Sequence, residues 1–308
     1  MKIRNNVMIA ITIVFTSCIV ISQHSFALYP GSTGAQFLKL GAGARAVAMG
    51  EAFVAVSDDI NGITYNPAGL SSITNHQLSF LHTEWLQSIR YENIAYCQPA
   101  LGGILGGSAT VLWIDDIERR TGDTPDPDGY APARDVSISI AYSKVISKSF
   151  STGINAKIIY QQLDDEYAYG GAVDLGMKYI ISQNLSLGFA LQNLGLETAF
   201  ISEQYPLPLN LKAGVADKIL PNLILASDIN YSLLDSVFQA GIGSEWALHP
   251  MFSIRGGYKY NSATFSLGAL SGLSVGAGFN INFLTIDYAF IPYGELGMTN
   301  RISLIARF

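Results

Sequence analysis

The last nine residues, NRISLIARF from Asn300 to Phe308, decide the fold class. Counting back from the end in steps of two gives four apolar residues: Phe308, Ala306, Leu304 and Ile302. The alternate set is Arg307, Ile305, Ser303 and Arg301, of which two are charged. Side chains of a β-strand alternate between its two faces. The stretch therefore predicts a strand with one apolar and one polar face, and the apolar face requires an apolar environment.

Composition indicates that this environment is a membrane. Charged residues make up 14% of the 308 residues, against about 25% in ordinary soluble domains. After the N-terminus, no uninterrupted apolar run reaches the roughly 18 residues that a spanning helix needs. A closed β-barrel is the other structure that satisfies every backbone polar group within lipid. The sequence therefore predicts an all-β membrane protein.

Residues 1–27 have the features of an export signal. The basic start MKIRNN precedes the apolar run VMIAITIVFTSCIVI, and Ser25 and Ala27 occupy the small-residue positions of a cleavage site. We predict cleavage after Ala27; the alternative is a lipoprotein site at Cys18. Cleavage after Ala27 removes Lys2 and Arg4 from the 18 basic residues and leaves 16 against 24 acidic ones. This balance argues against nucleic acid as a partner.

From residue 75 onward, segments of about ten residues alternate in hydrophobicity and are separated by turn residues, as in transmembrane barrels. In SISIAYSKV, for example, Ile138, Ile140 and Tyr142 share one face. The predicted strands span residues 77–84, 89–98, 103–114, 135–145, 150–161, 171–181, 184–193, 208–217, 222–231, 236–246, 251–260, 272–281, 283–291 and 299–308. These are fourteen strands, an even number as in bacterial single-chain barrels. We therefore predict a 14-stranded antiparallel transmembrane β-barrel over residues 75–308. Its expected location is the cell outer membrane of a Gram-negative-type envelope.

The connections between these segments alternate in length. Those expected at the periplasmic end are short, near residues 99–102, 146–149, 182–183, 218–221, 247–250 and 282. Those expected outside are mostly longer: 115–134, 162–170, 194–207, 261–271 and 292–298, with short exceptions at 85–88 and 232–235. Short periplasmic turns and longer external loops are typical of outer-membrane barrels. The lengths therefore support the barrel independently.

Residues 28–74 do not alternate and are rich in small residues. Ser57 or Asp58 is expected to cap a short helix that ends by Tyr65. Asn66 then suits an N-cap and Pro67 the first position of another helical turn. Such a segment is too short to fold alone, and a barrel of this size has room for it. We therefore predict an N-terminal hatch of short helices inside the lumen.

The charged side chains of the strands are expected to face the lumen, where they pair or meet water. They are Lys157, Asp174, Lys178, Lys212, Asp228, Glu245, Arg255, Lys259, Asp287, Arg301 and Arg307. Within the hatch, Arg45 is expected to contact Asp58 or Asp59; the alternative is lumen water or a wall carboxylate such as Asp174, Asp228 or Asp287. Phe308 ends the last strand as an aromatic residue at the membrane interface, which resembles the signal read by the barrel-assembly machinery.

The hatch segment resembles the N-terminal signature of the PorV/PorQ family. The resemblance rests on LGAGARAVAMGEAFVAVSDDINGITYNPAGL, and includes Arg45, Asp58-Asp59 and Asn66-Pro67-Ala68-Gly69-Leu70. It is more distant to FadL-type (OMPP1/FadL/TodX) outer-membrane transporters, which share the Asn-Pro-Ala hatch. The resemblance implies a fourteen-stranded barrel with a hatch. Glu51 departs from the small residue that relatives often have.

This resemblance implies two functions. The first is a secretion-accessory or partner-binding barrel, as in type IX secretion, whose partners are secretion-system or secreted proteins. The alternative is passive uptake of hydrophobic small molecules such as fatty acids. The chain is shorter than typical FadL-type transporters, which leaves less loop for capturing a ligand. Outer-membrane lipid and the barrel-assembly machinery are expected partners in either case.

Three motifs look chemical. GLSVG, with Ser274, matches a nucleophile elbow, but its alternation continues a strand, so Ser274 is expected in the lumen. GAGARA (Gly41, Gly43, Ala46) lacks the strand-and-helix crossover of a dinucleotide site. DTPDPDG (Asp123, Asp126, Asp128) is expected to be a solvated loop, with Ca²⁺ binding as the alternative. The histidines lack zinc-site spacing, and Cys97 alone closes no disulfide. We therefore expect no enzyme activity, cofactor or metal site.

Overall fold

The computed structural model describes residues 31–308 except 197 and 265–267. The predicted signal over residues 1–27, its cleavage after Ala27 and the alternative site at Cys18 lie outside the described residues. Within the described part, none of the helices is long and apolar enough to cross a membrane.

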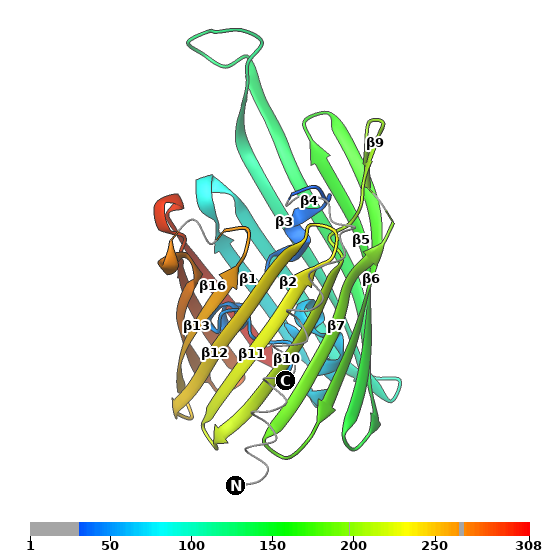
Figure 1. The fold of residues 1–308 in the computed structure, drawn as a ribbon, viewed down its shortest axis with the longest axis vertical. Coiled ribbons are helices and arrows are strands. Elements are labelled where there is room, and N and C mark those ends of the chain that lie inside the picture. The colour runs from blue at the N-terminus through cyan, green and yellow to red at the C-terminus, as the bar shows by residue number, and fades with distance from the viewer. Residues whose placement is uncertain (1–30, 197, 265–267) are drawn as a thin grey trace.

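Fourteen strands form a closed antiparallel barrel, which confirms the predicted architecture (Figure 1). The strands are β1 (Gln77–Glu84), β2 (Arg90–Ala100), β3 (Gly103–Arg119), β4 (Gly129–Ser147), β5 (Phe150–Leu163), β6 (Glu166–Ile180), β7 (Leu185–Gly195), β10 (Asn210–Leu220), β11 (Leu223–Ser232), β12 (Val237–His249), β13 (Phe252–Asn261), β14 (Leu273–Ile281), β15 (Leu284–Pro292) and β16 (Met298–Arg307). Each strand pairs with its neighbour in this order. The barrel closes where β16 pairs with β1, from Gln77↔Arg307 to Glu84↔Asn300.

The remaining elements are short. The helical turns are η2 (Gln36–Lys39), α2 (Ala44–Ala48), α3 (Gly62–Tyr65), η3 (Pro67–Ser72), η4 (Leu86–Ser88), η6 (Ala269–Gly272) and η7 (Gly294–Leu296). A separate hairpin of β8 (Thr198–Phe200) and β9 (Glu203–Tyr205) was not predicted. The first four turns, in blue in Figure 1, belong to the N-terminal segment, which lies inside the barrel.

Exposure along β16 shows which face meets lipid. Ile302 and Leu304 are 47% and 36% exposed, whereas Arg301 and Ser303 are 1% and 2% exposed. The apolar face of the terminal stretch therefore points away from the barrel and its charged face points into the lumen. Arg301 is buried because it lies in the protein-filled lumen, where its Nη1 donates to the carbonyl of Gly41 at 2.6 Å.

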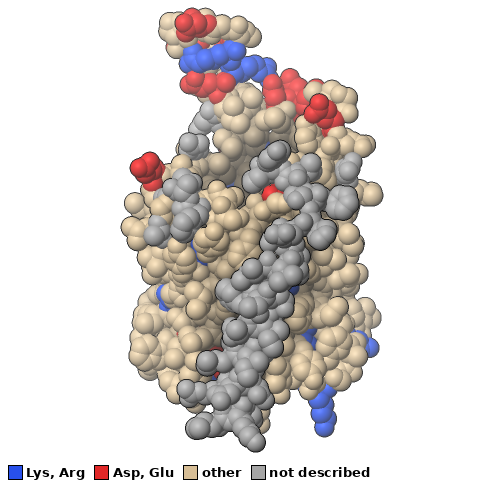
Figure 2. Space-filling view, viewed as in Figure 1, with Lys and Arg blue, Asp and Glu red and all other residues tan. Residues whose placement is uncertain are grey.

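Outward-facing aromatic residues gather near both ends of the wall, as in the girdles of membrane barrels. At one end, Phe308 stacks on His76 with 5.7 Å between ring centroids. At the other end, Tyr160 lies beside Tyr167 and Tyr169. Figure 2 shows that charged residues on this face collect mainly at the upper end, and that few charged atoms are visible in the broad band below them. The band between the girdles is the part of the wall suited to lipid.

The connections alternate in length as predicted, so we call the two ends of the barrel the loop end and the turn end. Two predicted external loops are shorter than expected. The strands β3 and β4 continue into the predicted loop 115–134 and leave only residues 120–128 between them, and a turn at 164–165 replaces most of the predicted loop 162–170. The prediction was wrong here because strands above the membrane have water on both faces. Their ladders then continue without alternating hydrophobicity.

Glycines of the barrel wall allow the N-terminal segment to lie directly on the wall backbone. A Cβ atom at Gly243 would lie 2.1 Å from the carbonyl oxygen of Met49, and one at Gly257 would lie 2.1 Å from the backbone nitrogen of Gly50. Similar contacts, all at 2.3 Å, face Gly153, Gly176 and Gly188. We call these five residues the glycine belt. Because the opposing atoms are mostly backbone, a side chain at the belt would displace the segment.

We predict that Gly257→Ala lowers the free energy of unfolding by about 1–3 kcal/mol, the usual cost of overpacking. The matched control is Gly256→Ala on the same strand, because a Cβ there meets no atom within 4 Å. Urea unfolding in lipid vesicles, followed by tryptophan fluorescence, measures both variants. Equal unfolding midpoints for the two variants would show that the close contact carries no stability.

Candidate functional site: the filled lumen

The N-terminal segment enters the lumen at the loop end. The backbone N–H of Gly34 donates to the carbonyl of Pro206 at 2.9 Å. The hydroxyl of Thr33 and the ammonium of Lys39 both contact the buried carboxylate of Asp235, in the turn between β11 and β12. These contacts hold the start of the segment near the loop end.

Arg45 joins the segment to the wall through a group of ion pairs. This group is the most extensive one among the described residues of the lumen. Its Nε and Nη2 donate to the two carboxylate oxygens of Glu245 on β12, at 2.7 and 2.8 Å. Its Nη1 donates to Asp59 at 2.9 Å and also to Asp58. The structure thus combines the expected contacts within the segment with a wall carboxylate. Charge-assisted pairs of this kind are strong and directional.

The wall continues this network away from the segment. Arg255 on β13 donates through Nε to Glu245 at 2.6 Å and through Nη1 to Asp287 on β15 at 2.7 Å. Burial alone would raise the pKa of the Asp58 carboxyl, but the Arg45 guanidinium lowers it below its ordinary value. Asp58 therefore remains ionised at neutral pH and balances part of the positive charge.

Asn66 and Pro67 lie at the turn end of the segment. The Asn66 amide donates to the carbonyls of Val54 at 2.9 Å and Met177 at 3.0 Å, and its oxygen accepts from the N–H of Ala68 at 3.1 Å. Asn66 is thus the N-cap of η3 with Pro67 at the first helical position, as predicted. Gly69 is packed so tightly that a Cβ would lie 2.1 Å from the carbonyl oxygen of Ser57.

The predicted cap of α3 was wrong. Asn61, not Ser57 or Asp58, precedes this helix, and its side chain makes no capping bond. The Ser57 hydroxyl donates to the carbonyl of Phe53, and Asp58 binds Arg45. A tertiary ion pair has replaced the local cap.

Other polar wall residues bind backbone groups of the segment. Asp228 on β11 accepts from the N–H groups of Phe53 and Val54, at 2.6 and 2.7 Å. Ser274 on β14 accepts from Gly50 and donates to the carbonyl of Ala48. Ser274, singled out in the GLSVG motif, therefore anchors the segment. The only sequence signal for this role was a polar residue at an inward position of a strand.

The remaining predicted lumen charges are also held inside the barrel. Lys157 on β5 pairs with Asp174 on β6 at 2.7 Å. The Lys178 ammonium on β6 donates to the carbonyl of Val56 at 2.6 Å. Lys259 on β13 pairs with Glu51 of the segment at 2.6 Å, so Glu51 is an anchoring carboxylate here.

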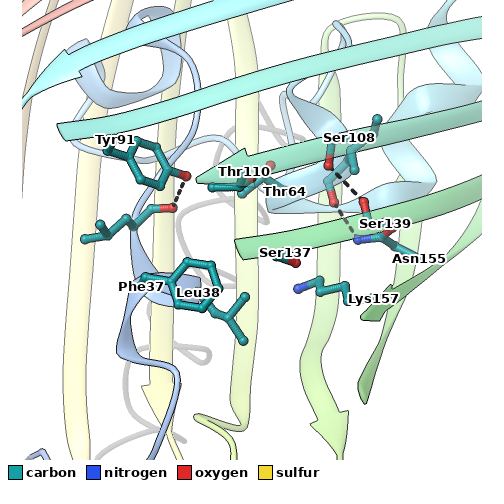
Figure 3. A pocket seen from close by; sticks show the side chains of 12 residues that line it. Phe37, Leu38, Thr64, Tyr91, Ser108, Thr110, Ser137, Ser139, Asn155 and Lys157 are labelled. Atoms are coloured by element: carbon teal, nitrogen blue, oxygen red, sulfur yellow. Dashed lines mark hydrogen bonds between the residues drawn. The ribbon is translucent and has the colours of Figure 1, made fainter. Parts of the chain in front are cut away.

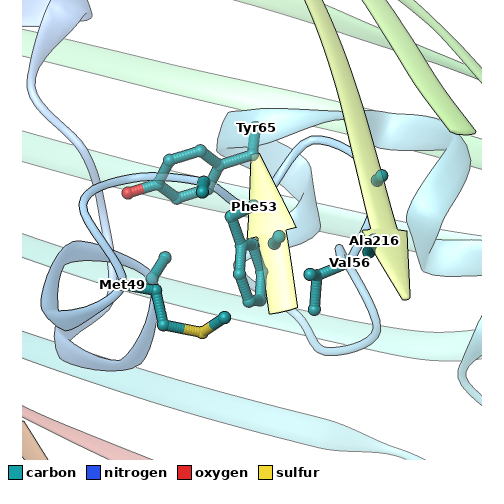
Figure 4. Close-up of a cluster of buried hydrophobic side chains, with 9 residues drawn as sticks. Met49, Phe53, Val56, Tyr65 and Ala216 are labelled. Carbon is teal, nitrogen blue, oxygen red and sulfur yellow. The ribbon is translucent and has the colours of Figure 1, made fainter. Parts of the chain in front are cut away.

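Apolar side chains fill the space between these polar contacts. The cluster in Figure 4 places Met49, Phe53, Val56 and Tyr65 of the segment against Ala216 of β10. The rings of Phe53 and Tyr65 meet edge to face, with 5.4 Å between their centroids. These side chains occupy the space between the segment and the wall.

A small cavity remains at the loop side of the segment (Figure 3). Its volume is about 30 Å³. The apolar side chains of Phe37, Leu38 and Leu40 form one side, and the wall residues Ser108 and Ser139, whose hydroxyls lie 2.8 Å apart, form the other. This space suffices for water, whereas an engineered cavity that holds benzene measures about 150 Å³.

The residues of the other motifs that look chemical pack or form hydrogen bonds within the protein. Gly41, Gly43 and Ala46 lie within the buried segment, and a Cβ at Gly43 would collide with Asn61. In the loop 120–128, Asp128 accepts from the hydroxyl and N–H of Thr121. Within the described residues, no group of three His, Cys, Asp or Glu side chains is placed to hold a metal ion. Cys97 is buried with a free thiol.

Comparisons with known proteins give a partial family match and several related folds. A model described as an uncharacterised protein family (UPF0164) matches residues 17–164. No curated protein sequence matches the chain.

Solved structures resemble the whole barrel. The Ralstonia pickettii toluene transporter TbuX aligns with a TM-score of 0.62 and 13% identity, over 87% of this chain and 98% of that one. The Pseudomonas putida toluene transporter TodX aligns at 0.59 and 14% identity, over 87% and 96%. A Pseudomonas aeruginosa FadL homologue aligns at 0.59 and 12% identity, over 86% and 97%. At these identities the likeness concerns the fold, which is that of the FadL- and TodX-type barrels.

We predict that Arg45→Met lowers the free energy of unfolding by about 3–5 kcal/mol, because it leaves buried carboxylates without their partner. The control is Arg120→Met, since Arg120 lies in the exposed loop and pairs only with Glu118 and a loop carbonyl. Urea unfolding in vesicles measures both. If Arg45→Met lowers the free energy of unfolding no more than the control does, water must hydrate the carboxylates that lose their partner.

Proposed function

We propose that this protein is an outer-membrane channel that admits small hydrophobic molecules. The observation that carries the proposal is the filled lumen: a buried segment, with apolar clusters on both sides, occupies the route that a hydrophilic solute would take. A pore for hydrophilic solutes would need a continuous water path. Hydrophobic molecules instead gain free energy when they leave water for an apolar surface.

The entrance in this proposal is the loop end, where Phe37, Leu38 and Leu40 line the small cavity. The cavity does not hold an aromatic ring in its present volume, so entry requires movement of η2. This movement must break the pair between Lys39 and Asp235. It must also withdraw the Phe37 side chain, which is buried against Ile159 and Leu207. TbuX and TodX, two toluene transporters whose fold this chain shares, support the same substrate class.

The gate in this proposal is the predicted hatch of residues 28–74 within the barrel of residues 75–308, and the structure describes it from residue 31 onward. Arg45, Asp58 and Asp59 hold it to the wall, and Asn66 to Gly69 close the turn end, which we assign to the periplasm. Phe308 is assigned to assembly, because its backbone closes the seam with His76 at the turn end.

A second candidate is the secretion-accessory role of the PorV/PorQ type. The hairpin of β3 and β4 supports it, because this hairpin projects beyond the rest of the barrel and carries charged residues at its tip (Figures 1 and 2). A secretion system or a secreted protein would then be the partner. Co-purification of such a protein with the wild-type chain, and its loss when residues 115–132 are replaced by a short turn, would favour this role.

The uptake prediction is tested in a strain without its own hydrocarbon channel. Expression of the protein should raise the initial rate of toluene or oleate uptake, with no change in the entry of a large hydrophilic antibiotic. The filled lumen gives the reason for this selectivity. If neither hydrophobic compound enters faster although the protein is folded in the membrane, the channel proposal fails.

The gate prediction concerns the double variant Asn66→Ala/Pro67→Ala. It removes the η3 cap and the fixed backbone of the first turn, so we expect antibiotic entry to rise several-fold. The matched control is Asn222→Ala/Pro221→Ala, which changes the same residue types in an exposed turn between β10 and β11. Heat-modifiable electrophoretic mobility confirms that each barrel is folded. Unchanged antibiotic entry in the folded variant would exclude this segment as a gate.

A further inference from the structure

Two arginines and a tryptophan lie side by side on the outer wall. The register of the ladder places Arg90 on β2 opposite Trp113 on β3, and Trp113 opposite Arg134 on β4. All three occupy outward positions, since their neighbours Tyr91 and Leu112 pack inside the barrel. We call them the Arg–Trp–Arg row.

The row lies at the level of a membrane interface. The same register continues from Arg134 to Gln162 on β5 and from there to Tyr167 on β6. Tyr167 belongs to the aromatic group that marks the girdle at the loop end. Arginine and tryptophan at this depth meet lipid headgroups rather than lipid chains.

The arginines have little competition from protein carboxylates. The nearest oxygen of Asp115 lies 3.9 Å from Nη2 of Arg134, and both side chains are about half exposed. Glu84 is the cross-strand neighbour of Arg90, but no carboxylate among the side chains that the structure describes lies within ion-pair distance of that guanidinium. An exposed ion pair such as Arg134–Asp115 contributes little free energy. Both guanidinium groups thus remain available to an anion.

Their separation suits a single phosphate. Adjacent strands lie about 4.8 Å apart, so the backbones of Arg90 and Arg134 are roughly 10 Å apart across β3. Two arginine side chains can converge over Trp113 from this distance. Arginine donates in a planar fork that matches the oxygens of a phosphate group.

An apolar groove lies on the same wall toward the turn end. Its volume is about 440 Å³, and it exists because Gly107 and Ala109 on β3 leave space between larger neighbours. The larger residues that line it include Leu78, Ile94, Ile138 and Ile140. Ile94 and Ile138 lie four positions from Arg90 and Arg134, which is about 13 Å along a strand. This is a distance that the upper part of a lipid chain spans.

We propose that this face is a binding site for a phosphate-bearing membrane lipid of the leaflet at the loop end. Arg90 and Arg134 bind the phosphate, Trp113 lies beneath the headgroup, and one acyl chain occupies the groove over Gly107 and Ala109. The site is separate from the lumen and does not depend on the transported compound. It holds the β2–β4 wall, from which the long hairpin rises, at a set depth in the membrane.

Native mass spectrometry of the full chain purified in detergent tests the site. The probes are phosphatidylglycerol and a diacylglycerol with the same chains, which lacks the phosphate. We expect phosphatidylglycerol to bind roughly tenfold more tightly, since two charge-assisted contacts are added. The double variant Arg90→Gln/Arg134→Gln should remove this preference, whereas the control Arg120→Gln should keep it.

A second variant tests the groove independently. Ala109→Leu fills it and should weaken the binding of both lipids several-fold, while Ala240→Leu, at a lipid-facing position of β12 away from the groove, should not. Unchanged mobility on heating confirms that all the barrels are folded. The proposal is overturned if the wild-type protein shows no preference for phosphatidylglycerol, if the preference survives in the double arginine variant, or if the two alanine variants behave alike.

Discussion

The pairing of β16 with β1 is the interaction on which the rest of the structure depends. It closes the sheet, so that each strand of the barrel has a partner on both sides, as a chain surrounded by lipid requires. Closure of fourteen strands also sets a diameter that wall side chains alone do not fill. The lumen must therefore hold either water or protein, and in this chain it holds residues of the N-terminal segment.

The way in which the lumen is filled explains the unusual use of glycine. A segment of short turns exposes many backbone groups, and each needs a partner once it is buried. The glycine belt lets these groups approach the wall, where Asp228 and Ser274 bind them directly. Close approach and hydrogen bonding are thus two parts of one arrangement. They make the segment a fixed part of the barrel at its centre. Its start is held at the loop end by the contacts of Asp235 and by Phe37, which is buried against wall residues.

The charged residues are distributed differently between the lumen and the outer wall. The segment and the wall exchange ion pairs in the lumen, where Arg45, Glu245 and Arg255 form a connected network across three elements. The outer wall carries almost no charge in its central band, and the Arg–Trp–Arg row lies at its border. A hydrophobic compound would therefore meet apolar residues at the loop end first, and the ion pairs only deeper in the lumen.

The alternation of apolar and polar residues determined the strands, because a wall with lipid outside and protein inside requires a period of two. It also predicted that the charged faces of β5, β6 and β13 point inward, and local geometry identified Asn66 and Pro67 as the start of a helical turn. Tertiary structure alone decided which charges meet. Arg45 and Glu245 are two hundred positions apart, and no local pattern specifies a contact that exists only after the barrel closes. Three further features could not be predicted from the sequence for the same reason: the glycine belt, the replacement of the α3 cap by an ion pair, and the Arg–Trp–Arg row. Each depends on strand register or on the path of the segment through the lumen.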